Sequence, residues 1–226
     1  MMALKIGIVG TGSVARNNYV PYLAQQEDVE LVYLTRTRAK AEALAAEHGG
    51  RVLDSPAELA AEEPDAVMVL THETQRAEAI EALLEHSFKR LFFEKPLVAR
   101  NGQENVCEDD FFTARELLKR AEAQGTETAM VFNYRFFEQT QRARRMVAER
   151  EFGQPLQVVA YSHYATWSHV IDLVHLFAGP IVAMAAVDSA EARESGNNAA
   201  VDVGGAFRFA GGAVGTILGT LSPTFA

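Results

Sequence analysis

The sequence predicts an α/β protein in which a doubly wound parallel sheet is followed by a smaller α+β domain. From residue 5 to about 124, short runs rich in β-branched residues alternate with stretches whose apolar residues recur at helical spacing. The short runs are almost entirely apolar, as is typical of parallel strands buried on both faces. Beyond residue 134 the pattern changes to alternating strands separated by glycine-containing turns.

Each element of the first domain follows from this alternation. The parallel strands are expected at residues 6–9, 29–34, 66–70 and 91–93. The helices between them are expected at residues 15–25, 39–48, 57–62 and 76–86, and a helix at 111–123 leads to a last strand at 128–132. Because successive βαβ units place helices on both faces of a sheet, we expect a doubly wound arrangement.

The second domain is expected to form an open, mainly antiparallel sheet with helices. The helices are predicted at residues 138–150 and 168–177, and the strands at 156–161, 181–187, 201–209 and 213–221. The turns "SGNN" and "AGG" separate the last three strands, which favours an antiparallel meander. The predicted domains are therefore residues 1–133 and 134–226.

Composition limits the class of protein. A formal net charge of -9 opposes general binding to nucleic acid, and no apolar run reaches the ~20 residues that span a bilayer. The single cysteine, Cys107, excludes an internal disulfide and fits a reducing compartment. We therefore expect a soluble cytoplasmic protein with a small-molecule substrate and with neither nucleic acid nor membrane as a partner.

A glycine-rich stretch directly follows the first predicted strand and opens the first predicted helix. Its pattern, Gly10-x-Gly12-x-x-Ala15, fits the dinucleotide-binding fingerprint of a Rossmann domain. Gly10 permits the tight turn, Gly12 leaves room for a pyrophosphate, and Ala15 lets the helix pack closely on the strand. The alternative is a tight turn without a ligand. The candidate cofactor-binding residues of this stretch are Gly10, Thr11, Gly12, Ser13, Val14 and Ala15.

The end of the second predicted strand indicates which dinucleotide is bound. An acidic residue there accepts hydrogen bonds from the ribose of NAD, but this strand runs into Thr35-Arg36-Thr37-Arg38. Thr35 can donate a hydrogen bond to a phosphate oxygen, and Arg36 can pair with the phosphate or stack on adenine. The prediction is NADP(H) in preference to NAD(H); the alternative is a solvated arginine pair.

A Glu94-Lys95-Pro96 tripeptide follows the strand expected at 91–93. The carboxyl ends of parallel strands are where open α/β sheets bind ligands. Pro96 restricts Lys95 to extended conformations and fixes its direction. The alternative for Lys95 is a surface ion pair with Glu94.

Taken together, these motifs resemble the Gfo/Idh/MocA family of oxidoreductases. The resemblance rests on the glycine turn, on Glu94-Lys95-Pro96, on "FNYRF" at 132–136, on "HVIDLVHLFAG" at 169–179 and on "FRFAGGAVGTILG" near the end. It implies hydride transfer between a nicotinamide and a carbinol or ketone carbon of a sugar or cyclitol. Glu94, Lys95, Pro96 and Thr71 would contact the cofactor.

The resemblance also implies catalytic roles. Lys95 would hydrogen-bond the reacting oxygen, and His169 would act as general acid or base, because imidazole titrates near working pH. Asp172, one helical turn after His169, would orient the imidazole or make a capping hydrogen bond. The alternative for His169 is a histidine at the helix start that bonds a backbone carbonyl.

The sequence departs from the family pattern near His169. Ala165 stands where many members have a catalytic aspartate, and the preceding loop is short. The candidate substrate-binding residues are Lys95, Arg135, Tyr164, Trp167 and His169, although the aromatic residues fit a core role equally well. His163, His169, Asp172 and His175 do not have the spacing typical of a metal site, so no metal is expected.

Two further departures affect the functional prediction. Thr71 keeps its place after the third predicted strand of the main alternation, but Glu73 stands where the family has a neutral amide. The chain is also shorter than the family's members, so we expect its second sheet to be covered in a homodimer or homotetramer; the alternative is that the chain is truncated. The alternative function is a catalytically weakened dinucleotide-binding sensor or an assembly subunit.

Overall fold

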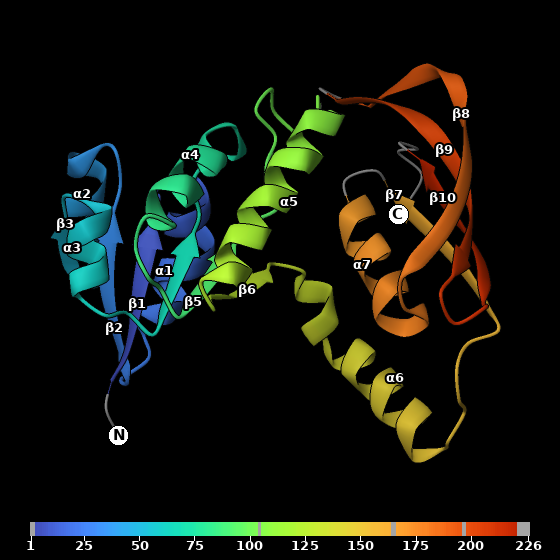
Figure 1. Cartoon of the computed structure of the whole chain (residues 1–226), viewed down its shortest axis with the longest axis horizontal. Coiled ribbons are helices and arrows are strands. Elements are labelled where there is room, and N and C mark those ends of the chain that lie inside the picture. The colour runs from blue at the N-terminus through green and yellow to red at the C-terminus, as the bar shows by residue number, and fades with distance from the viewer. Residues whose placement is uncertain (1–2, 104, 164–165, 196–197, 221–226) are drawn as a thin grey trace. The chain divides into compact units, whose positions relative to one another are not determined.

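The computed structural model describes residues 3–103, 105–163, 166–195 and 198–220 (Figure 1). The chain divides into two compact units, Met1–Val131 and Phe132–Ala226. Among the described residues, no helix combines the length and the apolar character that crossing a membrane requires.

The first unit is built on a six-stranded, wholly parallel sheet with strand order β3-β2-β1-β4-β5-β6 (Figure 1). Its strands are β1 Leu4–Val9, β2 Val29–Leu34, β3 Arg51–Leu53, β4 Ala66–Val69, β5 Arg90–Phe93 and β6 Glu127–Met130. The chain runs outward from β1 to β3 and then crosses back to β4. The strand order therefore reverses between β1 and β4, which is the topological switch point where such sheets bind ligands.

Helices cover both faces of this sheet, as the doubly wound prediction requires. They are η1 Ala15–Tyr19, α1 Val20–Leu23, α2 Arg38–His48, α3 Pro56–Ala61, α4 Glu73–Leu83 and α5 Glu108–Ala123. One apolar core contains Ala15, Val20 and Leu44 from η1, α1 and α2. A second contains Leu59, Ile80 and Leu117 from α3, α4 and α5. The two cores confirm the predicted fold class of this unit.

Two local features differ from the sequence prediction. The first helix begins at residue 13 and contains a π-helical turn, η1, where a helix from 15 to 25 was expected. Strand β3 was not predicted, because its three residues, of which Arg51 is exposed, carry no apolar run. Strand β3 nevertheless pairs with β2 at the edge of the sheet.

The second unit is a four-stranded sheet with strand order β7-β10-β9-β8 and two helices (Figure 1). Its elements are η2 Asn133–Phe136, α6 Glu138–Glu149, β7 Gln157–His163, α7 Trp167–Ala178, β8 Ile181–Ser195, β9 Asn198–Phe209 and β10 Val214–Thr220. β8, β9 and β10 are antiparallel, and β7 joins β10 in parallel. The prediction of a mainly antiparallel sheet is confirmed. Residues 196–197 of the "SGNN" turn and residue 221 of the last predicted strand lie outside the described residues.

Helix α7 packs on one face of this sheet. Val174 and Ala178 of the helix form an apolar core with Phe209 and Ile217 of the strands. Because α7 also carries His169 in its first turn, this packing fixes the direction in which the helix presents that residue.

Candidate functional site

The predicted glycine turn lies at the switch point of the first sheet. Gly10 has a φ of 94°, and a Cβ on it would lie 2.7 Å from the backbone nitrogen of Thr71. The backbone nitrogen of Gly10 also donates to the carbonyl of Leu34 at 2.8 Å. Gly10 therefore allows the ends of β1, β2 and β4 to meet, which a residue with a side chain would prevent.

The second glycine of the turn has a different environment. A Cβ on Gly12 would meet no atom of the described residues within 4 Å, so the backbone there borders open space. Ser13 is exposed, Val14 is half-buried, and Ala15 is fully buried against the sheet. This is the arrangement in which a pyrophosphate can approach the backbone while the helix packs closely on β1.

Two buried hydroxyls line the same region. Oγ1 of Thr11 and Oγ1 of Thr71 are buried, and neither has a hydrogen-bond partner among the described residues. Buried polar atoms normally have partners, and phosphate and ribose oxygens of a dinucleotide are suitable ones. The residues at the turn therefore fit a dinucleotide.

Thr35 and Arg36 follow β2 directly, as expected. In the amide orientation that satisfies both groups, the side-chain oxygen of Gln75 accepts hydrogen bonds from Nη1 and Nη2 of Arg36 at 3.2 Å. No carboxylate of the described residues lies within 4 Å of the Arg36 guanidinium. Arg38, by contrast, pairs with Glu42 at 2.8 Å and with Asp54.

The Glu94-Lys95-Pro96 segment leaves the carboxyl end of β5, and its Lys95–Pro96 peptide is cis. Oε1 of Glu94 accepts a hydrogen bond from the Tyr19 hydroxyl at 2.9 Å, and Oε2 accepts one from the backbone nitrogen of Lys95 at 2.8 Å. Burial and, second, the charge of Glu94 raise the pKa of Tyr19. Within the described part of the chain, no carboxylate lies within 4 Å of the Lys95 ammonium, so an ion pair with Glu94 does not form.

In the second unit, the "FNYRF" motif forms η2 and surrounds His169. The His169 ring stacks on Tyr134 with 4.5 Å between centroids and 16° between planes. Phe132 meets the same imidazole edge-on at 6.0 Å. The motif therefore lies against α7, the helix that carries His169. The stack with Tyr134 fixes the plane of the half-buried imidazole ring.

Asp172 binds Arg135 of the same motif. Nε and Nη2 of Arg135 each donate to one carboxylate oxygen of Asp172 at 2.6 Å. The hydrogen bond with Asp172 is the main cause that raises the pKa of Arg135. Both oxygens of Asp172 are therefore engaged by Arg135, and the carboxylate ties η2 to α7.

The remaining predicted site residues lie in different places. Trp167 is partly buried and packs against the apolar core of the second unit, where a Cβ on Gly219 would overlap its ring; a contact between Trp167 and a substrate stays a prediction. Tyr164 and Ala165 lie outside the described residues. Among the described residues, no three His, Cys, Asp or Glu side chains form a group that could hold a metal ion.

Comparison with known proteins identifies the family. A family model described as "Oxidoreductase family, NAD-binding Rossmann fold" matches residues 4–126, which is more than half of the chain. The chain belongs to the Gfo/Idh/MocA family. The family resemblance inferred from the motifs is confirmed.

Individual relatives of this Gfo/Idh/MocA protein agree with the assignment. D-glucoside 3-dehydrogenase of Escherichia coli K12 is 30% identical over 154 residues, which cover 67% of this chain and 41% of the relative. The myo-inositol dehydrogenase of Corynebacterium glutamicum has a TM-score of 0.76 at 19% identity, covering 100% of this chain and 70% of that one. The WlbA dehydrogenase of Bordetella pertussis, in complex with NADH and UDP-GlcNAcA, has a TM-score of 0.76 at 19% identity, covering 99% and 68%. The solved structures share the fold.

Sequence reasoning missed two partners that the structure reveals. Gln75 and Tyr19 hold Arg36 and Glu94, respectively. Both partners come from helices whose polar residues look like ordinary surface positions in the sequence. No local pattern would have identified them, because each contact joins elements that are far apart in the chain.

Proposed function

We propose that this chain is an NAD(P)-dependent oxidoreductase that transfers hydride between a nicotinamide and a carbinol or ketone carbon of a sugar- or cyclitol-like molecule. The observation that carries the proposal is the glycine turn at the switch point, with open space at Gly12. Beside it, the buried hydroxyls of Thr11 and Thr71 have no hydrogen-bond partner within the described part of the chain. The family assignment and the name of the Escherichia coli relative support the reaction class.

The cofactor that these residues favour is NADP(H) over NAD(H). A 2′-phosphate carries negative charge that an acid at the end of β2 would repel, and Thr35 and Arg36 occupy that place. The Gln75 oxygen holds the Arg36 guanidinium without neutralising its charge. Arg36 is therefore available for a phosphate, whereas Arg38 is engaged by carboxylates.

The proposed catalytic roles are as follows. When bound, the nicotinamide supplies or accepts the hydride. Lys95 hydrogen-bonds the reacting oxygen and stabilises negative charge that develops on it. His169 takes the hydroxyl proton when the carbinol is oxidised and returns it to the oxygen in the reverse direction.

Side chains of η2 and α7 support His169. Tyr134 holds the His169 ring by stacking, and Asp172 holds the η2 turn through Arg135, so Asp172 acts as a positioning residue. The Arg135 side chain remains 40% exposed and can also meet a substrate hydroxyl. A contact between substrate and Tyr164 stays a prediction.

A dinucleotide-binding sensor without turnover is the second candidate. Glu73 favours it, because an acid in the first turn of α4, next to the Thr71 loop, disfavours an anionic ligand. Lys95→Met separates the two functions. Both proteins are assayed with a panel of sugars and cyclitols. If the chain is an enzyme, the wild type turns over a substrate, and Lys95→Met loses that turnover while it keeps its affinity for NADPH. If the chain is a sensor, the wild type binds NADPH but neither reduces nor oxidises any compound of the panel.

We further propose that the outer face of the second sheet joins copies of this chain in a homodimer or homotetramer. On the face opposite α7, register places Tyr161, Leu218 and Val187 in one row across the strands. Val187 is 76% exposed and Val159 in the next row is 72% exposed. Light scattering would show a monomer for Leu218→Lys if this face is the interface, and an unchanged oligomer if it is not.

A further inference from the structure

Helix α4 buries an arginine at the carboxyl edge of the first sheet. Arg76 is 3% exposed and has no carboxylate within 4 Å among the described residues. Its Nη1 donates to the carbonyl oxygen of Glu94 at 2.8 Å and to that of Pro96, and its Nη2 donates to the carbonyl of Thr71 at 2.5 Å. Arg76 thus joins the loop after β5 to the end of β4.

This placement is costly for a cation. Burial lowers the pKa of Arg76, and the charges of Glu94 and Glu73 oppose that effect without binding the guanidinium. The neighbouring residues Ala77 and Ile80 lie in the apolar core, so an apolar side chain in place of Arg76 would avoid the cost of desolvation. What the guanidinium adds is a planar set of donors that can reach carbonyls on two separate loops.

Two of the three carbonyls that Arg76 binds, those of Glu94 and Pro96, flank Lys95 in the chain, and the third, that of Thr71, lies at the end of β4. The backbone nitrogen of Lys95 is bound in turn by the Glu94 carboxylate, which Tyr19 holds from η1. We propose that Arg76 is a positioning residue that fixes the direction of the Lys95 side chain by clamping the peptide units on either side of it to β4. The effect of this clamp on catalysis rests on the proposed function, whereas the clamp itself does not.

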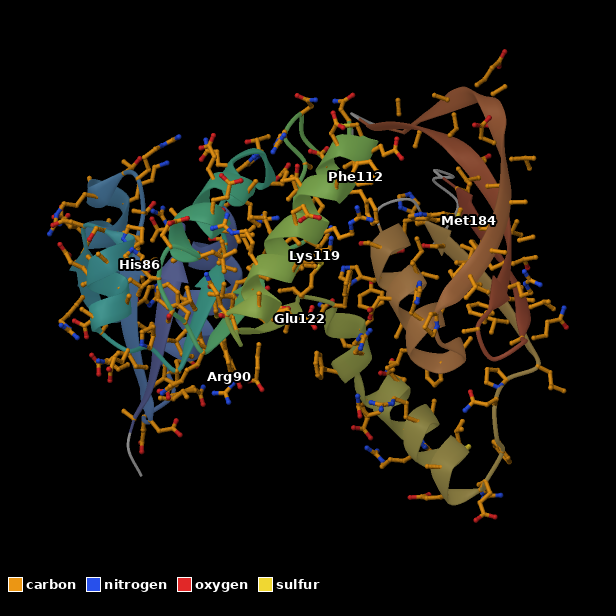
Figure 2. The ribbon with its side chains drawn as sticks, viewed as in Figure 1. His86, Arg90, Phe112, Lys119, Glu122 and Met184 are labelled. Carbon is orange, nitrogen blue, oxygen red and sulfur yellow. The ribbon has the colours of Figure 1, made fainter. Side chains whose placement is uncertain are left out.

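Hydrogen exchange tests the clamp without any ligand. The variants are Arg76→Met, which removes the donors, and Arg76→Lys, which keeps a charge and fewer donors. The matched control is Arg90→Met, since Arg90 is an exposed arginine of β5 (Figure 2). It pairs with Glu127 at 2.7 Å. In Arg76→Met we expect the amides of residues 93–98, apart from Pro96, which has no N–H, to exchange about tenfold faster or more, while residues 29–34 of β2 keep the wild-type rate. Arg90→Met should match wild type at residues 93–98.

Kinetics test the consequence. If Lys95 is misplaced, it no longer stabilises the negative charge that develops on the reacting oxygen in the transition state. The kcat of Arg76→Met should therefore fall by about 100-fold. The dissociation constant for NADPH should rise by less than about tenfold, and Arg76→Lys should recover part of kcat. A purely structural arginine would instead change kcat and NADPH affinity to the same extent.

The outcomes are distinguishable. Wild-type exchange at residues 93–98 in Arg76→Met overturns the clamp, and accelerated exchange with wild-type kcat overturns its role in positioning Lys95. If Arg76→Met does not fold, Arg76→Lys decides both points by the same two measurements. If the wild-type protein neither binds NADPH nor turns over, the proposed function fails, whereas the exchange result still decides whether the clamp exists.

Discussion

Arg135 and Asp172 form a bidentate ion pair in which both hydrogen bonds measure 2.6 Å. The pair joins the η2 turn to α7, and the same two elements hold His169 against Tyr134. Because the Asp172 side chain is only 6% exposed, it depends on Arg135 for its hydrogen bonds. The ion pair and the aromatic stack together fix the imidazole that we propose as the acid or base.

Replacing Asp172 with asparagine should destabilise the protein and disturb this stack. The loss should be about 1–3 kcal/mol in the free energy of unfolding, because a buried charged hydrogen bond is removed. Urea denaturation measures it. The control is Glu138→Gln, which breaks the exposed pair between Glu138 and Arg145 and should cost less than about 1 kcal/mol. Equal stability of the two variants would contradict a structural role for the Arg135–Asp172 pair.

The two glycines of the turn should respond differently to alanine. Gly10→Ala places a Cβ 2.7 Å from the Thr71 backbone at a φ of 94°, so we expect a loss of about 1–3 kcal/mol or more in the free energy of unfolding. Gly12→Ala meets no atom of the described part of the chain within 4 Å and should leave stability nearly unchanged while weakening dinucleotide binding. Thermal denaturation and a cofactor titration check the pair. A Gly12→Ala variant with wild-type NADPH affinity would argue against a pyrophosphate at this turn.

Arg36 and Arg38 offer a matched test of cofactor preference. Arg36→Ala should lower NADPH affinity by about 10- to 100-fold with little change for NADH, because it removes a charged hydrogen bond to the 2′-phosphate. Arg38→Ala removes a positive charge two residues away, but there the guanidinium already forms ion pairs with Glu42 and Asp54. Arg38→Ala should therefore change the affinity for NADPH or NADH less than Arg36→Ala changes the affinity for NADPH. Fluorescence titration gives the affinities. Equal losses in both variants would show that general charge, and not the position of Arg36, matters.

Glu62 provides a pH-dependent contribution to stability. Hydrogen bonds from Arg51 and then from Lys5 lower the pKa of Glu62 from 4.5 to about 2. Because the folded-state pKa is depressed, this stabilisation is fully present above the unfolded value and is lost as the pH falls from about 4.5 toward 2. Glu62→Gln should therefore be less stable than wild type at pH 7, and the difference should shrink through that interval. Unfolding measured over a pH series checks it; a difference independent of pH would contradict the assignment.

Much of the fold is predictable because burial leaves a pattern in the sequence. The strands ending at Val9, Leu34, Val69 and Phe93 end in buried or partly buried apolar residues, so each reads as an apolar run that stops where the functional loops begin. The glycine turn is predictable for the same local reason, since it must follow β1 directly. Strand β3 leaves no such trace, because it is short and lies at the sheet edge.

The partners of the candidate site residues could not be predicted in this way. Asp172 lies one helical turn from His169, which suggested that it orients the imidazole, yet its carboxylate binds Arg135, 37 residues earlier in the chain. Arg76 resembles a surface residue in a helix that is polar on one side, and only the fold shows it buried among carbonyls of two loops. Such contacts depend on which loops the topology brings together, and this information is not contained in any local spacing.

We propose that the switch-point turn binds a dinucleotide with preference for NADP(H). Titration of the wild-type protein with NADPH and with NADH, followed by nicotinamide fluorescence, tests it most directly. The structure of the turn and the position of Arg36 predict saturable binding of both, with NADPH bound at least about tenfold more tightly. Tighter binding of NADH would contradict the preference assigned to Arg36, and no binding of either cofactor would contradict the claim itself.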